Sequence, residues 1–219
     1  MDSLHKLEEL FTHFPGIGPR QAKRFVYYLL SRSPATIQEF IKLIEEVRKS
    51  TSECKQCHRL FVIDSNLKSP ISNLCPTCSD ANRDHSILMI VARDSDFESI
   101  ERSGVYKGLY FILGGTVPIL DKEPEKRIRL KALLERITDT HKITNNQDAI
   151  IKEIILSLNT TPDGEHTADI VREAINKTTS KNSSLQSTKV TVLGRGLSTG
   201  AELEYADSET IRNALSNRK

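Results

Sequence analysis

The four cysteines of this 219-residue chain lie in one short segment, in two pairs of identical spacing. Cys54 and Cys57 form the first CxxC pair, seventeen residues follow, and Cys75 and Cys78 form the second. Two such turns present four thiolates that can reach one tetrahedral Zn²⁺ ion. We therefore predict one zinc ion bound by these four cysteines. Its role should be structural, because four thiolates leave no ligand position open for catalysis.

The compartment bears on the chemistry of these thiols. The chain starts without the basic and long apolar segments of a signal peptide, and no apolar run approaches the roughly 20 residues of a membrane span. We therefore expect a cytoplasmic protein with no membrane partner, where paired cysteines rarely form structural disulfides. A redox-active pair and a site that has lost its metal remain alternatives. His58 adjoins Cys57 and is only a spare ligand.

A second candidate site is the stretch HFPGIGPRQAKRF, residues 13–25, where two glycines and two prolines interrupt a helical pattern. Apolar residues recur at helical spacing on both sides, which predicts a tight turn between two packed helices. Gly16 and Gly18 allow a positive φ or a close backbone approach, and Pro19 suits the first position of the second helix. Such a turn leaves unpaired N–H groups at the positive end of a helix dipole, which favours phosphate.

The charge around this turn supports the same interpretation. The net charge of +2 is too small to indicate nucleic acid by itself, but no Asp or Glu occurs from Phe11 through Gln38. Several basic residues stand in that window, and Arg32 is the last of them. We predict that the hairpin contacts the DNA backbone and not the bases, through Gly16, Gly18, Arg20, Lys23 and Arg24. A helical hairpin that only packs, with a solvated basic face, is the alternative.

The rest of the chain alternates between strand and helix patterns. Apolar runs of strand length occupy residues 87–91, 109–113, 153–158 and 189–193. One helical pattern, residues 37–47, precedes the cysteines, and three more lie among the strands, at 94–102, 125–137 and 165–175. We expect Asp94 to cap the helix that it begins, and residues 178–188 to form a loop. This alternation predicts an α/β fold with a helical N-terminal region and a parallel sheet whose strands are buried on both faces.

The order of these parts resembles the RecR family of bacterial recombination mediators. The resemblance is carried by PGIGPRQAKR (15–24), the two CxxC pairs, SGVYKGLYFILGG (103–115), NTTPDGEHTA (159–168) and GRGLSTGAELEYAD (194–207). It implies a helix-hairpin-helix domain at 1–52, a four-cysteine zinc finger at 53–80, a Toprim-like parallel α/β domain at 81–180, and a short C-terminal α/β segment at 181–219.

The resemblance also implies a function in DNA repair without enzymatic turnover. Family members assemble into dimers or ring-like tetramers that clamp DNA, single-stranded or duplex, without sequence specificity. They act with RecO, and in some settings RecF, to help load RecA onto single strands. The resemblance places Arg20, Lys23 and Arg24 on the DNA-binding surface of a nucleoid-associated protein. It places Asp163 and Glu165 on an acidic Toprim loop that contacts a partner.

Departures from the Toprim pattern argue against catalysis. Ala92 stands where the first strand usually ends in glutamate, and Asn159 and Thr161 replace the Asp-x-Asp pair that binds Mg²⁺ in Toprim enzymes. Hard divalent cations need oxygen-rich, usually carboxylate sites, so we predict no catalytic residues. A metal-dependent nuclease, primase or topoisomerase fragment is the main alternative, with Asp94, Asp163 and Glu165 regrouped around one ion. A protein–protein adaptor that never touches DNA is a third possibility.

Overall fold

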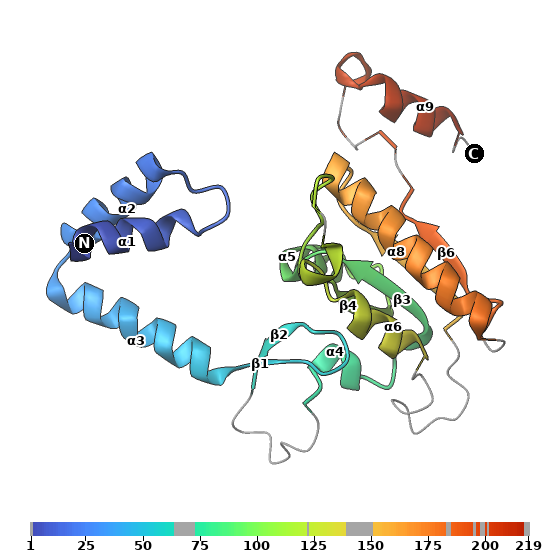
Figure 1. The fold of residues 1–219 in the computed structure, drawn as a ribbon, viewed down its shortest axis with the longest axis horizontal. Helices are drawn as coiled ribbons and strands as arrows, with labels where there is room; N and C mark the ends of the chain where they lie inside the picture. The colour runs from blue at the N-terminus through green and yellow to red at the C-terminus, as the bar shows by residue number, and fades with distance from the viewer. Residues whose placement is uncertain are drawn as a thin grey trace. The chain divides into compact units, whose positions relative to one another are not determined.

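The computed structural model describes residues 2–63, 73–121, 123–138, 151–182, 185–194, 196–197, 200 and 202–216 (Figure 1). The chain divides into two compact units. One holds Met1–Thr51 with Val62–Asn66, and the other holds Ser52–Phe61 with Leu67–Lys219. None of the described helices is long and apolar enough to cross a membrane.

The first unit is helical, as the sequence predicts. It contains α1 (Ser3–Thr12), α2 (Pro19–Leu30) and α3 (Pro34–Ser50). α1 and α2 form a hairpin in which α2 buries Ala22 and Val26, and the rings of Phe11 and Phe25 lie 5.8 Å apart. α3 begins at the cap Ser33, whose hydroxyl accepts the Thr36 N–H, and no residue of α3 is buried.

The second unit is built on a parallel four-stranded sheet in the order β4-β3-β5-β6. The strands are β3 (Asp84–Val91), β4 (Gly108–Ile112), β5 (Glu153–Ser157) and β6 (Lys189–Val192). Each neighbouring pair is parallel, so the carboxyl ends of all four strands meet at one edge. The α/β fold with a helical N-terminal region is therefore confirmed.

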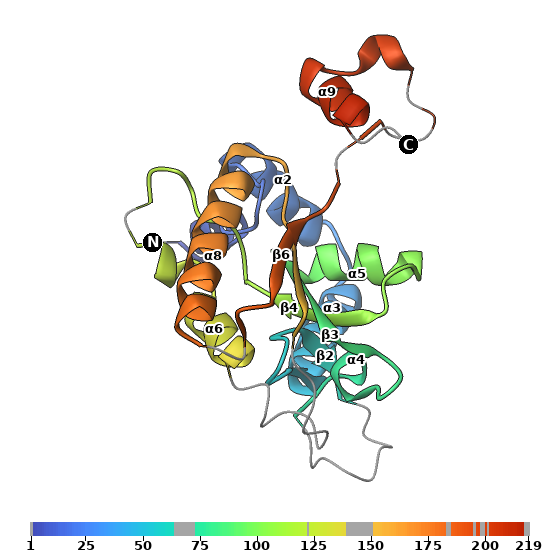
Figure 2. The same cartoon turned by 90° about the vertical axis from the view of Figure 1, so that its right-hand side faces the viewer.

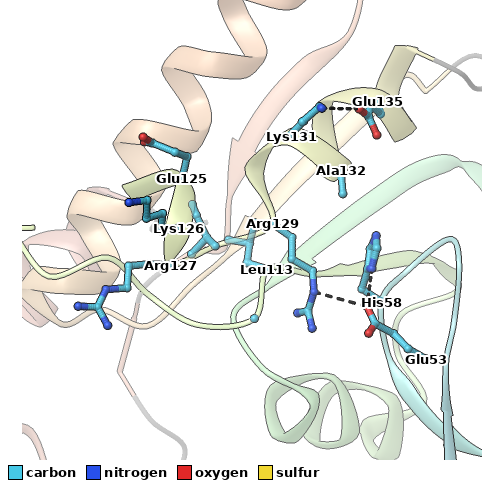
Figure 3. Close-up of a pocket in the computed structure, with 12 residues that line it drawn as sticks. Glu53, His58, Leu113, Glu125, Lys126, Arg127, Arg129, Lys131, Ala132 and Glu135 are labelled. Atoms are coloured by element: carbon cyan, nitrogen blue, oxygen red, sulfur yellow. Dashed lines mark hydrogen bonds and ion pairs between the residues drawn. The ribbon is translucent and has the colours of Figure 1, made fainter. Parts of the chain in front are cut away.

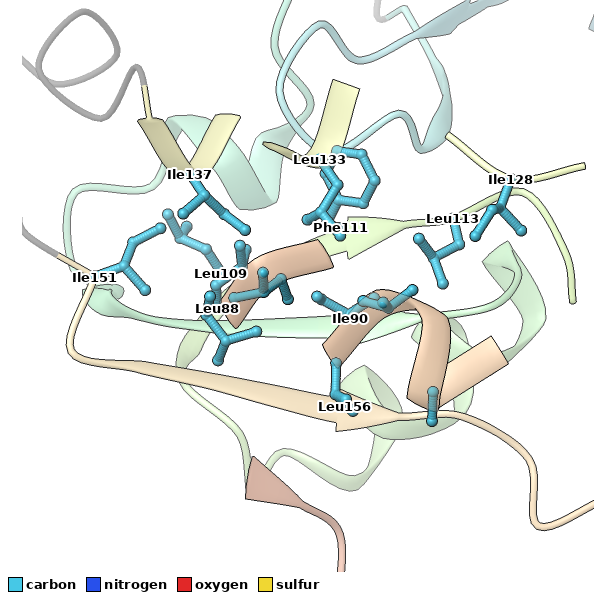
Figure 4. Close-up of a cluster of buried hydrophobic side chains, with 14 of the residues drawn as sticks. Leu88, Ile90, Leu109, Phe111, Leu113, Ile128, Leu133, Ile137, Ile151 and Leu156 are labelled. Carbon is cyan, nitrogen blue, oxygen red and sulfur yellow. The ribbon is translucent and has the colours of Figure 1, made fainter. Parts of the chain in front are cut away.

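Helices cover both faces of this sheet. α5 (Asp94–Ser103) packs on one face, while α6 (Leu130–Thr138) and α8 (Pro162–Lys181) pack on the other (Figure 2). Because successive strand residues point to opposite faces, β3 divides its side chains between two cores. Leu88 and Ile90 join the larger core with Phe111 (Figure 4), and Met89 and Val91 join the smaller one with Phe97.

The structure corrects the expected boundaries at several points. α6 begins at Leu130 and not at residue 125, because Pro124–Lys126 forms the 3₁₀-helix η1. α8 is longer than the expected helix at both ends, and it includes residues 162–165 and 178–181, which were expected in loops. β6 has no buried residue, so the expectation of burial on both faces is wrong at this edge strand. A 3₁₀-helix η3 (Leu203–Tyr205) and α9 (Ser208–Ser216) follow.

Candidate functional site

The structure brings the four cysteines together. Cys54 and Cys57 lie in the turn between β1 (Thr51–Glu53) and β2 (Leu60–Val62), and Cys75 and Cys78 lie at α4 (Pro76–Ser79). All four are buried, and their Sγ atoms lie within 4.8 Å of one another. A tetrahedral zinc site with Zn–S bonds of about 2.3 Å needs Sγ–Sγ separations of about 3.8 Å. The cluster therefore has the size and donor set for one tetrahedral metal ion.

Hydrogen bonds of the backbone shape the two CxxC turns, which we call the first knuckle (Cys54–Cys57) and the second knuckle (Cys75–Cys78). The Cys54 N–H donates to Arg59 O at 2.8 Å, the His58 N–H donates to Cys54 O at 2.9 Å, and the Cys75 N–H approaches the Cys54 sulfur at 3.3 Å. N–H groups that point at sulfur stabilise a thiolate. The hydrogen bond between the Cys54 and Cys57 thiols lowers the pKa of Cys54 and raises the pKa of Cys57. Contacts of the Cys57 sulfur with the Cys75 sulfur at 3.5 Å, and of the Cys75 N–H with the Cys54 sulfur, join the two turns.

The first knuckle is attached to the open edge of the sheet. The Ile112 N–H at the end of β4 donates to Cys57 O at 2.8 Å. Arg136 of α6, only 7% exposed, donates through Nη1 to Gln56 O and, at 3.0 Å, to Tyr110 O. One guanidinium thus joins the segment between Cys54 and Cys57 to the edge strand. Sequence reasoning missed Arg136. Its position three residues after buried Leu133, on the apolar stripe of α6, was the available signal.

Arg136 also acts on the cluster through its charge. The hydrogen bond with Cys54 raises the pKa of Cys78, and the positive charge of Arg136 opposes that rise. Four thiolates around a divalent cation carry a net charge of −2, and a buried guanidinium offsets part of it. Arg136 therefore fits the metal-bound form of the cluster.

The carboxylates that follow β3 are engaged in structural hydrogen bonds. Asp94 Oδ1 accepts the Leu60 N–H of β2 at 3.0 Å, and Asp96 Oδ2 accepts the Arg93 N–H at 2.9 Å. The helix cap is Arg93, so the expectation that Asp94 caps α5 is wrong. Ala92, 1% exposed, has no side chain with which to bind an ion.

The segment after β5 differs from the expected acidic loop. Thr161 is the N-cap of α8, and its hydroxyl accepts the Gly164 N–H at 3.2 Å. Asp163 and Glu165 stand in the first turn of this helix, where carboxylates complement the helix dipole. Asp163 Oδ1 also accepts the Ile119 N–H at 3.3 Å, and Glu165 is exposed. Across the described ranges, the cysteines are the one cluster of three or more His, Cys, Asp or Glu with ligand spacing.

A pocket of about 610 Å³ lies beside the first knuckle (Figure 3). Several of its charged groups form ion pairs within the pocket: Glu53 Oε1 lies 2.6 Å from His58 Nδ1 and 3.5 Å from Arg129 Nε, and Lys131 Nζ lies 3.9 Å from Glu135 Oε1. Lys126 and Arg127 also line the pocket, but they pair with Glu123 and Asp121 outside it.

The hairpin turn has the expected form with one correction. Gly16 has φ +76°, in the left-handed region that favours glycine, and Pro19 opens α2. Gly18 has φ −85° and caps α2, and its N–H bonds to the Gln21 side chain at 3.3 Å. At Gly18 neither the positive φ nor the close backbone approach is present, since no atom lies within 4 Å of the place of a Cβ, so the expectation holds only for Gly16. The side chains of Arg20, Lys23 and Arg24 are exposed on α2.

Parts of two expected features lie outside the described residues. Residues 64–72 belong to the long interval between the cysteine pairs. Residues 195, 198–199 and 201 belong to the glycine-containing C-terminal stretch.

Comparison with known proteins agrees with this order of parts. Residues 86–193 match the family model of the Toprim domain, and residues 196–219 match that of the RecR C-terminal region. The chain is 34% identical to Recombination protein RecR of Bifidobacterium adolescentis, over 99% of this chain and 96% of that protein. It is 31% identical to Recombination protein RecR of Prochlorococcus marinus strain MIT 9301, over 98% of this chain and 94% of that protein.

Proposed function

The chain belongs to the RecR family of recombination proteins, and on that premise we propose that it is a DNA-binding mediator of recombination in DNA repair. It clamps DNA without sequence preference and acts with RecO, and in some settings RecF, to help load RecA onto single strands. This work takes place in the cytoplasm, at the nucleoid. The observation that carries the proposal is the exposed basic surface of α2 directly after the Gly16 turn.

The hairpin supplies the DNA contact in this proposal. Among the described residues, the N–H groups of Gly16 and Arg20 have no hydrogen-bond acceptor, and that of Arg20 stands in the first turn of α2. Such N–H groups and the helix dipole attract phosphate, and Arg20, Lys23 and Arg24 add positive charge. These contacts position the protein on the backbone and carry no sequence information.

Self-association supplies the clamp. α3 is amphipathic, yet its apolar side chains are about half exposed in one copy of the chain. The exposed set comprises Phe40, Ile41, Leu43, Ile44 and Val47. A contiguous apolar stripe of this kind favours an interface, and a second copy provides a matching surface. We propose that dimers or tetramer rings form in part through α3.

The metal in this proposal is one structural zinc ion. Four buried cysteines in CxxC turns are the donor set that zinc prefers. Zinc would stabilise this segment, because among its described residues the buried apolar cluster consists of the four cysteines, with Phe61 and Leu74 packed against them. Asp163 and Glu165 form the proposed contact with RecO, and the protein performs no catalytic turnover.

A salt titration of DNA affinity tests the central proposal. Lys23→Ala with Arg24→Ala should weaken binding about equally on unrelated sequences, and should lower the slope of log affinity against log salt by up to roughly one unit per lost phosphate contact. Lys131→Ala with Lys177→Ala removes the same charge from exposed sites and is the matched control.

Four outcomes separate the candidate functions. Weakened binding in the hairpin variant alone supports the mediator. Equal affinities and slopes in all variants, with zinc bound, would contradict the proposed hairpin contact. Complete absence of DNA binding would favour the adaptor, and Mg²⁺-dependent strand cleavage would favour the Toprim enzyme.

A further inference from the structure

The exposed face of α2 carries aromatic side chains between its cations. Ala22 and Val26 are buried, which defines the packed side of the helix. Successive residues of a helix are 100° apart around its axis. The side opposite the packed one therefore carries, in order around the axis, Lys23, Tyr27, Arg20, Arg24 and Tyr28. Tyr27 is 52% exposed and Tyr28 is 55% exposed. We call these five residues the tyrosine–cation face.

The cations hold the tyrosine rings in this face. Lys23 Nζ lies 5.9 Å from the centre of the Tyr27 ring, one helical turn away. The guanidinium carbon of Arg32 lies 4.0 Å from the centre of the Tyr28 ring, just beyond the end of α2. A cation over one face of a ring does not cover the other face, and both tyrosines remain about half exposed.

A phosphate grip alone does not account for the tyrosines. Backbone contacts need positive charge and N–H groups, and an exposed aromatic ring contributes neither. Successive bases of a single strand, in contrast, stack on aromatic side chains beside a basic groove, and any base can do so because each has a π-face. In a duplex the base faces are covered by their neighbours and cannot stack on a protein ring.

We propose that the tyrosine–cation face binds unpaired nucleotides, with Tyr27 and Tyr28 stacking on bases while Arg20, Lys23 and Arg24 hold the phosphates. This inference rests on the proposed DNA contact of the hairpin and adds a preference for single strands. The ligand is single-stranded nucleic acid of any sequence.

Charge complementarity favours this ligand over a second copy of the chain. Across the described residues, none of Arg20, Lys23, Arg24 and Arg32 forms an ion pair with a carboxylate. Residues 12–38 contain no acid at all. Two such faces would repel each other, whereas a polyanion neutralises both.

Fluorescence anisotropy with the full-length zinc-bound protein tests the proposal. The probes are an oligothymidylate and a duplex of the same length, both at several salt concentrations. Tyr27→Ala and Tyr28→Ala should each weaken binding to the single strand by about 5- to 150-fold, the cost of one lost stacking contact. Duplex affinity and both salt slopes should stay unchanged, because no phosphate contact is lost.

Two control variants isolate the aromatic ring. Tyr27→Phe with Tyr28→Phe keeps both rings and should keep single-strand affinity. Tyr205→Ala removes an exposed tyrosine from η3 and should have no effect. The chain has no tryptophan, so quenching of tyrosine emission by the oligothymidylate gives an independent signal of stacking.

Unchanged single-strand affinity in the Tyr27 and Tyr28 variants would overturn the stacking inference. If the Lys23/Arg24 variant still weakened binding to both probes, the proposed hairpin contact would stand by itself. An equal loss on both probes, accompanied by a lower mass in solution, would assign the tyrosines to an interface between copies and would also overturn the inference.

Discussion

Arg136 should be one of the largest single contributors to the stability of the α/β unit. Its guanidinium is buried and donates to two backbone carbonyls, Gln56 O in the first knuckle and Tyr110 O in β4. Arg136→Met keeps the length and the apolar stem of the side chain and removes both hydrogen bonds. Two carbonyls of the interior then lose their donor.

The expected cost follows from these two contacts. A hydrogen bond from a charged donor contributes about 1.5–3 kcal/mol. Because two such bonds are lost, we expect Arg136→Met to lower the free energy of unfolding by about 3–6 kcal/mol. Small domains have only about 5–15 kcal/mol in total. The variant should therefore unfold at clearly lower denaturant concentration.

Metal release should report the same linkage. Gln56 stands between the ligands Cys54 and Cys57, so a knuckle freed from Arg136 should give up zinc to a chromogenic chelator faster than the wild type does. Arg136→Lys keeps the charge and loses the planar fork of the guanidinium. Its free energy of unfolding and its rate of zinc release should therefore lie between those of the wild type and of Arg136→Met.

A neighbouring charge on the same helix provides the control. Lys131 also belongs to α6, but its side chain is 91% exposed. Lys131→Met should change the free energy of unfolding by no more than about 0.5 kcal/mol. If urea unfolding of Arg136→Met, with zinc in excess, matched that of Lys131→Met, the proposed link between knuckle and sheet would be refuted.

Three further changes test other parts of the chain. Gly16→Ala should destabilise the helical hairpin by about 1–2 kcal/mol in thermal unfolding, because φ +76° is strained for any side chain. Gly18→Ala should be tolerated in the same assay, because Gly18 has φ −85° and open space around it. Cys78→Ser should lose zinc in metal analysis, and a wild type purified without chelator that holds no zinc would disprove the metal assignment. Asp163→Asn with Glu165→Gln keeps an oxygen for the backbone amide that Asp163 binds, and should weaken RecO binding in a titration while DNA affinity stays constant.

The sequence by itself determined the features that depend on local spacing. Each CxxC pair places two thiols in one tight turn, and two such pairs indicate a four-thiolate metal site. Alternation of apolar runs and amphipathic stretches specifies a parallel sheet covered by helices, and a glycine–proline turn specifies the hairpin. Each of these signals is read from the order and spacing of residues along the chain, and therefore needs no knowledge of distant contacts.

Only the tertiary structure decided which distant groups meet. The strand order left the edge of β4 open, and the Cys57 carbonyl and Arg136 became its partners through contacts that no local pattern encodes. Asp94, a plausible helix cap by its spacing, instead binds the Leu60 amide thirty-four residues away. Which side of α2 carries exposed tyrosines depended on which side packs against α1. Helix periodicity defines faces, but only packing chooses the face that remains in solvent.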